Sequence, residues 1–368
     1  MAVCIVSPKA YLVLDEKQRK TFGGAEVQLT LLAKEMAKKG IEVDLIVGDY
    51  GQPYVITEDK LNIFKTIKSG KELKPRGIVR LGFAIWKSKA EVVIQRTLSP
   101  LTFFVAINSR LAGKRFVYMV AHDSETDKTH PIYRNPVGRL VAVLSFRIAN
   151  IIIVQNEQEK EALHQWVPTA ETAILKKGIE HHQISDNGSK KYDAVWVGRC
   201  EDWKNPDSFI RLARGMPDLR FAMVCPPATG KQHSYQMLHD EVESVPNLTF
   251  FERLPNQEIH ELLTTTKAYV ITSTKEGDWP MSVLEAAANG VPIISLNIDY
   301  GKLTEEYHGA CTCQGDETRM QWSLLTIVKD EQLWKQMSEG SWRYANDHHD
   351  LAKQTEVLLK YIGIFRTE

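Results

Sequence analysis

Two cations stand where a short apolar run gives way to a helical pattern in the second half of the chain. Residues 194–197 (AVWV) are typical of a strand and residues 206–214 of a helix, so Arg199 and Lys204 share a strand-to-helix loop. Arginine offers a bidentate fork and lysine a compact point charge, a combination suited to a diphosphate. Two solvated cations in a surface loop are the alternative.

A second candidate is the segment 275–286 (KEGDWPMSVLEA), which follows an expected strand at 268–271 and opens a helix. Pro280 suits the N1 position of that helix, so neighbouring N–H groups are available to phosphate or sugar oxygens. Glu285 lies in the first turns, where a carboxylate can accept a pair of hydroxyls such as those of a ribose. A dipole or capping role for Glu285 is the alternative.

Two further candidates lie in the first half of the chain. Gly23 and Gly24 open a helix expected at 25–39. Either their missing Cβ atoms let an anion approach the helix N-terminus, or the loop requires positive φ. His122 follows a strand expected at 116–120, and it either contacts a substrate at the carboxyl edge of the sheet or makes a structural hydrogen bond.

Other kinds of site lack their sequence pattern. No G-x-G-x-x-G follows a strand and no G-x-S-x-G is present, which disfavours a nicotinamide enzyme and a nucleophile elbow. The five cysteines are scattered, and Cys311-x-Cys313 lacks a second ligand pair, so we expect reduced thiols, no metal site and no cofactor. The longest apolar stretch, 140–154, is too short and too polar for a membrane span, and the N-terminus lacks a secretory pattern. We therefore expect a cytoplasmic protein.

The elements that must position these residues alternate between buried strands and amphipathic helices. The apolar run at 3–7, the helix at 25–39 and the strand at 42–47 form a β-α-β unit, with Gly40 as the C′ residue of the helix. The alternation recurs to the end of the chain, where residues 320–364 are helical in pattern. The fold class is α/β, with parallel sheets whose ligands bind beyond the carboxyl ends of the strands.

The pattern divides the chain into two domains. Residues 1–180 form the first and residues 193–345 form the second. The polar, Asn-Gly-containing segment 181–192 is expected to be the linker. Residues 346–368 are expected to form a C-terminal helix, with packing against the first domain as one option.

Composition and charge separate the two halves. The chain has 368 residues, of which 43% are hydrophobic and 25% charged, which excludes a disordered chain. Residues 1–180 hold 27 Lys and Arg against 19 Asp and Glu, a net charge of +8, and the remainder carries −8. A basic first half suits an anionic surface or an anionic acceptor, whereas attraction between two domains of one chain is the alternative.

One segment of the basic half combines cations with aromatic residues. Arg80, Lys87 and Lys89 flank Phe83 and Trp86 on an expected helix. This mixture predicts either contact with an anionic membrane surface or a partly buried amphipathic helix.

Six stretches together, in order, resemble the retaining family 4 glycosyltransferases of GT-B fold. They are GGAEVQLTLLAKEMAKKGIEV (23–43), the strand ending in His122-Asp123, IIVQNEQEKEAL (152–163), ILKKGIE (174–180), VGRCEDWKNP (197–206) and EGDWPMSVLEAAANGVPIIS (276–295). The resemblance implies two Rossmann-like doubly wound domains facing across a deep cleft. The first, residues 1–180, would bind the acceptor, and the second, residues 193–345, would bind the nucleotide sugar. Two departures stand out: eight residues, not the usual seven, separate Glu276 from Glu285, and Lys177 stands where Asn is common.

The resemblance also implies roles for individual residues. Arg199 and Lys204 would hold the donor diphosphate, Glu285 the ribose, and Glu276 or Asp278 the transferred sugar. His122 would bind or orient that sugar. The remaining implied donor contacts are Gly23 and Gly24 at the phosphates, Gly277, Trp279 and Met281 through the backbone, and Arg253 and Leu254 at the base.

These roles imply a metal-independent glycosyltransferase. It would move a sugar from a nucleoside diphosphate sugar to a hydroxyl of a glycan or lipid-linked acceptor, with retention of anomeric configuration and no nucleic-acid partner. It would be cytoplasmic, free or peripheral at the inner face of the membrane. A nucleotide-sugar epimerase and a non-catalytic glycosyltransferase-like subunit are the competing functions.

Overall fold

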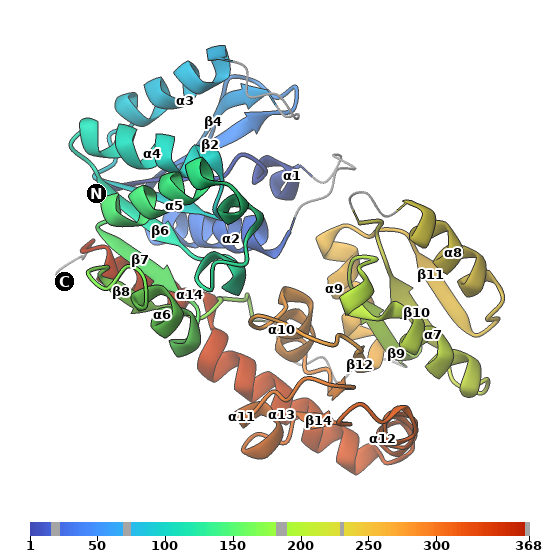
Figure 1. Ribbon diagram of the computed structural model, residues 1–368. Helices are drawn as coiled ribbons and strands as arrows, with labels where there is room; N and C mark the ends of the chain where they lie inside the picture. Colours follow the sequence, from blue (N-terminus) through green and yellow to red (C-terminus); the bar gives the residue numbers. More distant parts are fainter. Residues whose placement is uncertain (16–22, 69–74, 182–189, 229–231, 365–368) are drawn as a thin grey trace. The chain divides into compact units, whose positions relative to one another are not determined.

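The computed structural model in Figure 1 describes residues 1–15, 23–68, 75–181, 190–228 and 232–364. The chain forms two compact units. The first contains Met1–Gly178 and Leu351–Glu368, and the second contains Ile179–Asp350. Each unit is built on its own sheet, with helices on both faces.

The first unit has an eight-stranded sheet in the order β3-β4-β2-β1-β5-β6-β7-β8. Every neighbouring pair is parallel except β3 and β4, which form a hairpin. The strands are β1 (Ala2–Val6), β2 (Glu42–Asp49), β3 (Val55–Glu58), β4 (Leu61–Lys68), β5 (Val92–Arg96), β6 (Arg115–Met119), β7 (Ile151–Val154) and β8 (Thr172–Ile174).

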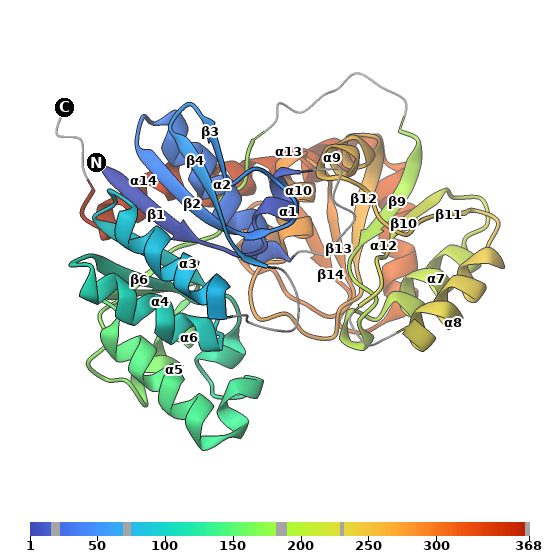
Figure 2. The same ribbon diagram turned by 90° about the horizontal axis from the view of Figure 1, so that it is seen from above.

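Two helical layers cover this sheet, as Figures 1 and 2 show. Alternate strand residues point to opposite faces, so β1 packs Val3 and Ile5 under α2 and α14, and Cys4 and Val6 under the other layer. The helices are α1 (Tyr11–Leu14), α2 (Gly24–Lys38), α3 (Pro75–Lys87), α4 (Pro100–Leu111), α5 (Pro136–Ile148), α6 (Glu157–His164) and α14 (Leu351–Tyr361), with short turns η1 (Asp123–Glu125) and η2 (Pro131–Arg134).

The second unit has a six-stranded, all-parallel sheet in the order β11-β10-β9-β12-β13-β14. Its strands are β9 (Tyr192–Val197), β10 (Phe221–Val224), β11 (Leu248–Phe251), β12 (Thr266–Ile271), β13 (Ile293–Ser295) and β14 (Ala310–Thr312). Its helices are η3 (Asp202–Lys204), α7 (Pro206–Gly215), α8 (Gln232–Glu243), α9 (Asn256–Thr264), α10 (Met281–Ala288), α11 (Lys302–Glu305), α12 (Glu317–Lys329) and α13 (Glu331–His349).

Both sheets have the doubly wound topology expected from the sequence. In the first, the chain builds outward from β1 through β2 and then returns to the other side at β5. In the second, the same reversal lies between β9 and β12. Such a reversal leaves the loops after the two central strands uncovered by crossover helices, and ligands bind there in open α/β sheets.

The ends of the two units differ from the expected positions. Ile179 belongs to the second unit because its N–H donates to the carbonyl of His349 at 2.7 Å and it pairs with Asp350 in a parallel bridge. The first segment therefore ends at residue 178 rather than 180, and the second unit extends to 350 rather than 345. Residues 182–189 of the expected linker lie outside the described residues, and Tyr192 already begins β9.

The C-terminal stretch that was expected to be helical forms three helices, α12, α13 and α14. Asp330 separates α12 from α13, and its side chain caps α13 by accepting the N–H of Leu333 at 2.9 Å. Asp350 separates α13 from α14. α14 lies in the first unit beside α2, where the ammonium of Lys39 contacts the carboxylate of Glu356 at 2.6 Å. Asp residues at both breaks explain them, because Asp favours extended cap positions over helix interiors.

Candidate functional site

The candidate site of the second unit is built from the loops that follow β9 and β12, at the reversal of strand order. The two strands are hydrogen-bonded neighbours. Their loops are bonded to one another as well: the N–H of Thr274 donates to the carbonyl of Trp203 at 2.8 Å. Residues 71 positions apart in the sequence are thereby held together at one edge of the sheet.

A buried polar relay supports this edge. The indole N–H of Trp196 donates to the hydroxyl of Thr272 at 3.0 Å, and that hydroxyl donates to the carbonyl of Lys204 at 2.8 Å. A buried indole N–H needs such a partner, so the relay fixes the end of η3 relative to β12. Sequence reasoning missed Thr272. The polar Thr-Ser pair directly after an apolar strand was its only signal.

Lys204 and Glu276 form an ion pair across the two loops. Only 15% of the Lys204 side chain and 9% of the Glu276 side chain are exposed. The Lys204 ammonium also lies 4.4 Å from the ring centre of Trp203. The two residues that the sequence assigned to different parts of a ligand therefore hold one another in place within the protein.

Arg199 lies in the same loop but is held loosely. Its guanidinium is 3.6 Å from the carboxylate of Glu201, and 47% of the side chain is exposed. An exposed pair of this kind contributes little to stability. The Arg199 side chain is therefore free to reorient towards a ligand, whereas Lys204 is fixed.

The N-terminus of α10 meets these loops. Pro280 is the N-cap residue, with φ −61° and ψ 139°, rather than the N1 residue expected from the sequence. The extended ψ value places Pro280 outside the helix, and Met281 is the first helical residue. No side chain caps this terminus, so the N–H groups of Met281 and Ser282 remain available to an anion.

Two hydroxyls tie the start of α10 to the end of β9. The Tyr269 hydroxyl donates to the carbonyl of Val197 at 2.9 Å and lies 2.8 Å from the Ser282 hydroxyl. Burial raises the pKa of Tyr269, and the nearby charges of Glu276 and Glu285 add to that shift, so the phenol stays protonated. Sequence reasoning missed this pair, because Tyr269 stands in no motif and the motif that contains Ser282 assigned no role to it.

Glu285 lies one turn into α10 and is partly buried. Loss of hydration raises the pKa of its carboxyl to about 7. Within the described ranges, neither a hydrogen bond nor an ion pair to this carboxylate is found. A desolvated carboxyl without a partner is a group prepared for hydroxyl donors from a ligand.

The loop between β12 and α10 is anchored by aromatic packing. The ring centre of Trp279 lies 4.5 Å from that of Tyr300 and 5.0 Å from that of Tyr344. This contact directs the Trp279 side chain into the protein and leaves the backbone of Gly277 and Asp278 at the loop surface. The buried Tyr300 hydroxyl has no hydrogen-bond partner within the described residues. Burial raises the pKa of this phenol, and the nearby charge of Glu276 raises it further.

Arg253 and Leu254 follow β11, two strands away from β9 at the same sheet edge. Leu254 packs against the core on the α9–α10 side of the sheet. Both side chains are half-buried. Arg253 and Leu254 thus follow a strand of the same sheet edge, two strands away from the loop that holds Arg199 and Lys204.

In the first unit, Gly23 caps α2 and Gly24 begins it. Gly23 has φ −119°, so the alternative of a loop that requires positive φ is wrong. Its N–H donates to the carboxylate of Glu26 at 2.8 Å. A carboxylate therefore already occupies one of the N–H groups of this helix terminus.

His122 follows β6 and caps the short turn η1. Its Nδ1 accepts the N–H of Ser124 at 3.1 Å, and the ring is exposed. Because Nδ1 is engaged, Nε2 is the ring atom that remains open to a ligand.

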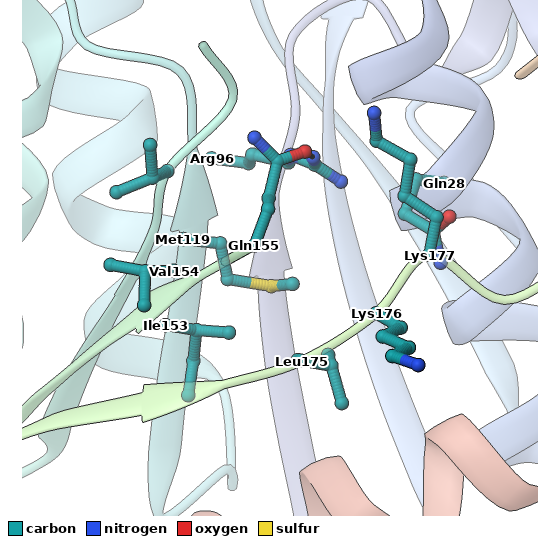
Figure 3. A pocket seen from close by; sticks show the side chains of 10 residues that line it. Gln28, Arg96, Met119, Ile153, Val154, Gln155, Leu175, Lys176 and Lys177 are labelled. Carbon is teal, nitrogen blue, oxygen red and sulfur yellow. Dashed lines mark hydrogen bonds between the residues drawn. The ribbon is translucent and has the colours of Figure 1, made fainter. Parts of the chain in front are cut away.

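A small pocket lies at the carboxyl ends of β5 to β8, beside the first turns of α2 (Figure 3). The Arg96 guanidinium donates to the Gln155 side chain at 2.9 Å, and only 7% of each residue is exposed. Gln28 enters from α2, is 1% exposed, and has no hydrogen-bond partner for either amide atom among the described residues. Lys176 and Lys177 complete the polar side of the pocket.

Two buried carboxyls, Glu159 and Glu125, lie close to residues that line this pocket. Glu159 accepts hydrogen bonds from the backbone and side chain of Gln155, both at 2.7 Å, and burial raises its pKa to about 8. Glu125 accepts the hydroxyl of Tyr118 at 2.7 Å, and burial raises its pKa as well. Burial therefore favours the protonated form of Glu159, and its two hydrogen bonds hold Gln155 beside Arg96.

A search of the described part of the chain finds no group of three or more His, Cys, Asp or Glu side chains arranged to hold a metal ion. In the same residues, none of the helices has the length and apolar character needed to span a bilayer.

Two family models together match most of the chain. The model described as "Glycosyltransferase Family 4" matches residues 22–183, and the model described as "Glycosyl transferases group 1" matches residues 179–342. An uncharacterised glycosyltransferase of Haemophilus influenzae is 22% identical over 340 residues, covering 89% of this chain and 92% of that protein. Alpha-galactosylglucosyldiacylglycerol synthase of Streptococcus pneumoniae is 26% identical over 243 residues, covering 64% and 61%.

Solved structures resemble the fold over its whole length. Sucrose-phosphate synthase of Thermosynechococcus elongatus has a TM-score of 0.77 at 13% identity, covering 99% of both chains. HepE of Anabaena, solved in complex with UDP and glucose, has a TM-score of 0.73 at 16% identity, covering 99% of this chain and 100% of that one. At such identities the likeness is one of fold.

Proposed function

Because this chain belongs to the family 4 glycosyltransferases of GT-B fold, we propose that it transfers a sugar from a UDP-sugar to an acceptor hydroxyl with retention of anomeric configuration. The observation that carries the proposal is the convergence of Arg199, the Lys204–Glu276 pair and the free N-terminus of α10 at one sheet edge. UDP is favoured as the nucleotide because HepE was solved with UDP and with UDP-glucose.

The Lys204–Glu276 pair has a specific part in this proposal. The diphosphate takes Lys204, and the hydroxyls of the donor sugar take Glu276, so the ligand replaces the contact that each residue loses. Arg199, which is exposed and weakly paired, swings onto the phosphates. Glu285 accepts the ribose hydroxyls, as its unpartnered carboxylate allows.

The chemistry follows from this distribution of charge. As the glycosidic bond breaks, negative charge grows on the diphosphate, and positioned cations together with the N–H groups of Met281 and Ser282 stabilise it. The leaving phosphate accepts the proton of the acceptor hydroxyl on the same face of the sugar, so the configuration is retained. These groups supply the positive charge locally, and we propose that transfer proceeds without a divalent metal or other cofactor.

The first unit supplies the acceptor side. We assign the acceptor to the pocket of Gln28, Arg96 and Lys177, with His122 beside the same sheet edge orienting the transferred sugar. Gln28 provides two unsatisfied amide groups and Arg96 a buried cation, so the pocket fits a hydroxyl or anionic group of a glycan or lipid-linked sugar. Gly23 and Gly24 lie at the N-terminus of α2, where their missing Cβ atoms leave the backbone accessible to an anionic group.

The first test is thermal stabilisation by UDP, GDP, ADP and CMP. A ligand at ~100 times its Kd adds roughly 2.7 kcal/mol to the stability of the folded state. We expect UDP to give the largest shift and Glu285→Ala and Arg199→Ala to abolish it. If none of the four nucleotides shifts the melting temperature, the donor site is wrong.

A second test addresses the reaction itself. Proton NMR of the product made from UDP-α-glucose should show an α-linked sugar at the first measurable time, and chelation with EDTA should leave the rate unchanged. A β-linked product would contradict retention, and activity that returns only with added Mg²⁺ would contradict metal independence.

A further inference from the structure

Three neighbouring helices of the first unit form one outer face of the sheet. α3 packs against α4, and α4 packs against α5, as Figures 1 and 2 also show. Their inner sides are buried in the core below, through residues such as Leu81, Val105 and Phe146. We call the outer surface of these three helices the α3–α5 face.

All the charged side chains of the α3–α5 face are cations. The three helices contain six cations, all exposed, and neither Asp nor Glu. None of the six makes an ion pair within the described residues. They are Arg76, Arg80 and Lys87 on α3, Arg110 on α4, and Arg139 and Arg147 on α5.

The same face exposes large apolar side chains. Of the 13 large hydrophobic residues exposed in the described structure, seven lie on these three helices, so the face is a concentrated apolar patch. They are Val79 (70% exposed), Phe83 (54%), Trp86 (53%), Ile107 (36%), Leu111 (66%), Val137 (72%) and Leu140 (58%).

The opposite layer of the sheet shows that this composition is not a general property of the unit. α2 carries Glu26, Lys34, Glu35 and Lys38, with Lys38 and Glu35 paired at 3.7 Å. Mixed charge of that kind is the ordinary surface of a helix facing water. The α3–α5 face instead combines six cations that make no ion pair within the described residues with seven exposed apolar side chains.

We propose that the α3–α5 face binds the surface of a membrane that contains anionic lipids. Six cations attract the negative headgroups, and apolar side chains spread over three helices enter the boundary between headgroups and acyl chains. A fluid lipid surface requires no shape complementarity, which suits apolar residues scattered among cations. A second copy of this chain would bring like charges together, so self-association through this face is disfavoured.

Membrane attachment would set the position of the first unit, which we have assigned to the acceptor. A lipid-linked acceptor in the same bilayer would then lie close to this unit. The binding itself depends only on the α3–α5 face and stands whether or not the donor proposal is correct.

Vesicle flotation with the full chain tests this proposal. Vesicles of phosphatidylcholine alone are compared with vesicles that also contain phosphatidylglycerol. We expect binding to the mixed vesicles only, weakened by high salt. Each cation near an anionic surface changes binding by roughly fivefold, so Arg80→Glu/Arg110→Glu should weaken it by at least about 25-fold.

A matched control keeps the charge change constant. Lys34→Glu/Lys360→Glu alters two exposed cations on α2 and α14 and should leave vesicle binding within about twofold of wild type. Leu111→Ser/Val137→Ser should remove the binding that persists at high salt. The proposal is overturned if wild type ignores the mixed vesicles, or if the control weakens binding as much as the α3–α5 variant.

The UDP-induced thermal shift is measured in the same preparations. An unchanged shift in Arg80→Glu/Arg110→Glu shows that the variant is folded, so its loss of vesicle binding is specific to the surface. Vesicle binding by a wild-type protein that lacks any nucleotide shift would contradict the donor site alone.

Discussion

Cations are used in opposite ways in two regions of this protein. At the edge formed by β9 and β12, Lys204 is largely buried, paired with Glu276 and fixed by backbone contacts. On the α3–α5 face, six cations are exposed and unpaired. Because Lys204 is fixed and largely removed from water, it interacts strongly with one ligand in one direction. The cations of the α3–α5 face are numerous and exposed, so they attract any anionic surface over a longer range.

Replacement of Lys204 should have the largest effect and tests the positioned cation. Lys204→Ala leaves the Glu276 carboxylate partly buried without its partner and removes a cation from the diphosphate. We expect kcat/KM to fall by about 10²–10³ and stability by about 1–3 kcal/mol. Lys87→Ala, on the exposed face, is the control and should change neither. Wild-type kcat/KM in Lys204→Ala would remove the distinction between the two regions.

The pH dependence of donor binding sharpens the comparison next. Burial raises the pKa of Glu285 to about 7, so below that pH the free protein must release a proton before the carboxylate can accept two ribose hydroxyls. Affinity for UDP-glucose should therefore rise about tenfold per pH unit below pH 7 and then level off. Isothermal titration calorimetry between pH 5.5 and about pH 8.5 checks this.

Glu285→Gln serves as the control for that titration, because an amide keeps the size of the side chain but does not titrate. Its binding should be weaker and flat with pH. The stability of the fold should change with pH in the opposite direction to donor affinity. Between about pH 4.5 and pH 7 the folded protein holds the Glu285 proton, whereas the unfolded chain releases it. This group therefore lowers the free energy of unfolding as pH rises through that window.

Tyr269→Phe probes how the site edge is held together. The change removes the hydroxyl that ties α10 to β9 through Val197 and Ser282. We expect a loss of about 1 kcal/mol in the free energy of urea unfolding. Tyr361→Phe, whose ring lies on the surface of α14, should leave that free energy unchanged. An equal loss in both variants would contradict a structural role for the Tyr269 hydroxyl.

The smallest effect is expected on the α3–α5 face. Arg110→Ala should leave the free energy of unfolding within about 0.5 kcal/mol of wild type, because Arg110 is exposed and makes no ion pair in the described structure. Transfer to a soluble acceptor should also be unchanged. A larger loss of stability would mean that this cation is positioned like Lys204, and the comparison would fail.

Elements with a strong local signal were predictable. The pattern of 25–39 and the turn at Gly40 indicated a helix and its C-terminus, and the structure has α2 at Gly24–Lys38 with Gly40 at φ 79°. The β3–β4 hairpin was missed, because its strands are partly exposed and its turn uses Asp59 at φ 50° rather than a glycine. The helix is indicated by neighbouring residues alone, whereas the hairpin forms only because β4 pairs with β2.

Within the candidate site, residue types and spacing indicated Arg199, Lys204, Glu276 and Glu285, but not how they are held. Thr272 and Tyr269 stand in no motif, and the motif that contains Ser282 does not indicate what that residue contacts. Their roles exist only because β9 and β12 are adjacent strands that come from distant parts of the sequence.

By itself, the sequence determined the α/β class, the two sets of strands and helices, and which residues stand in strand-to-helix loops, because periodicity and turn chemistry act over a few residues. Tertiary structure alone decided that Lys204 pairs with Glu276 and that three acid-free helices lie side by side. It also decided that the Glu285 carboxylate has neither a hydrogen bond nor an ion pair within the part of the chain that the structure describes. These are consequences of strand order and of the loss of water on packing, and neither is encoded at short range.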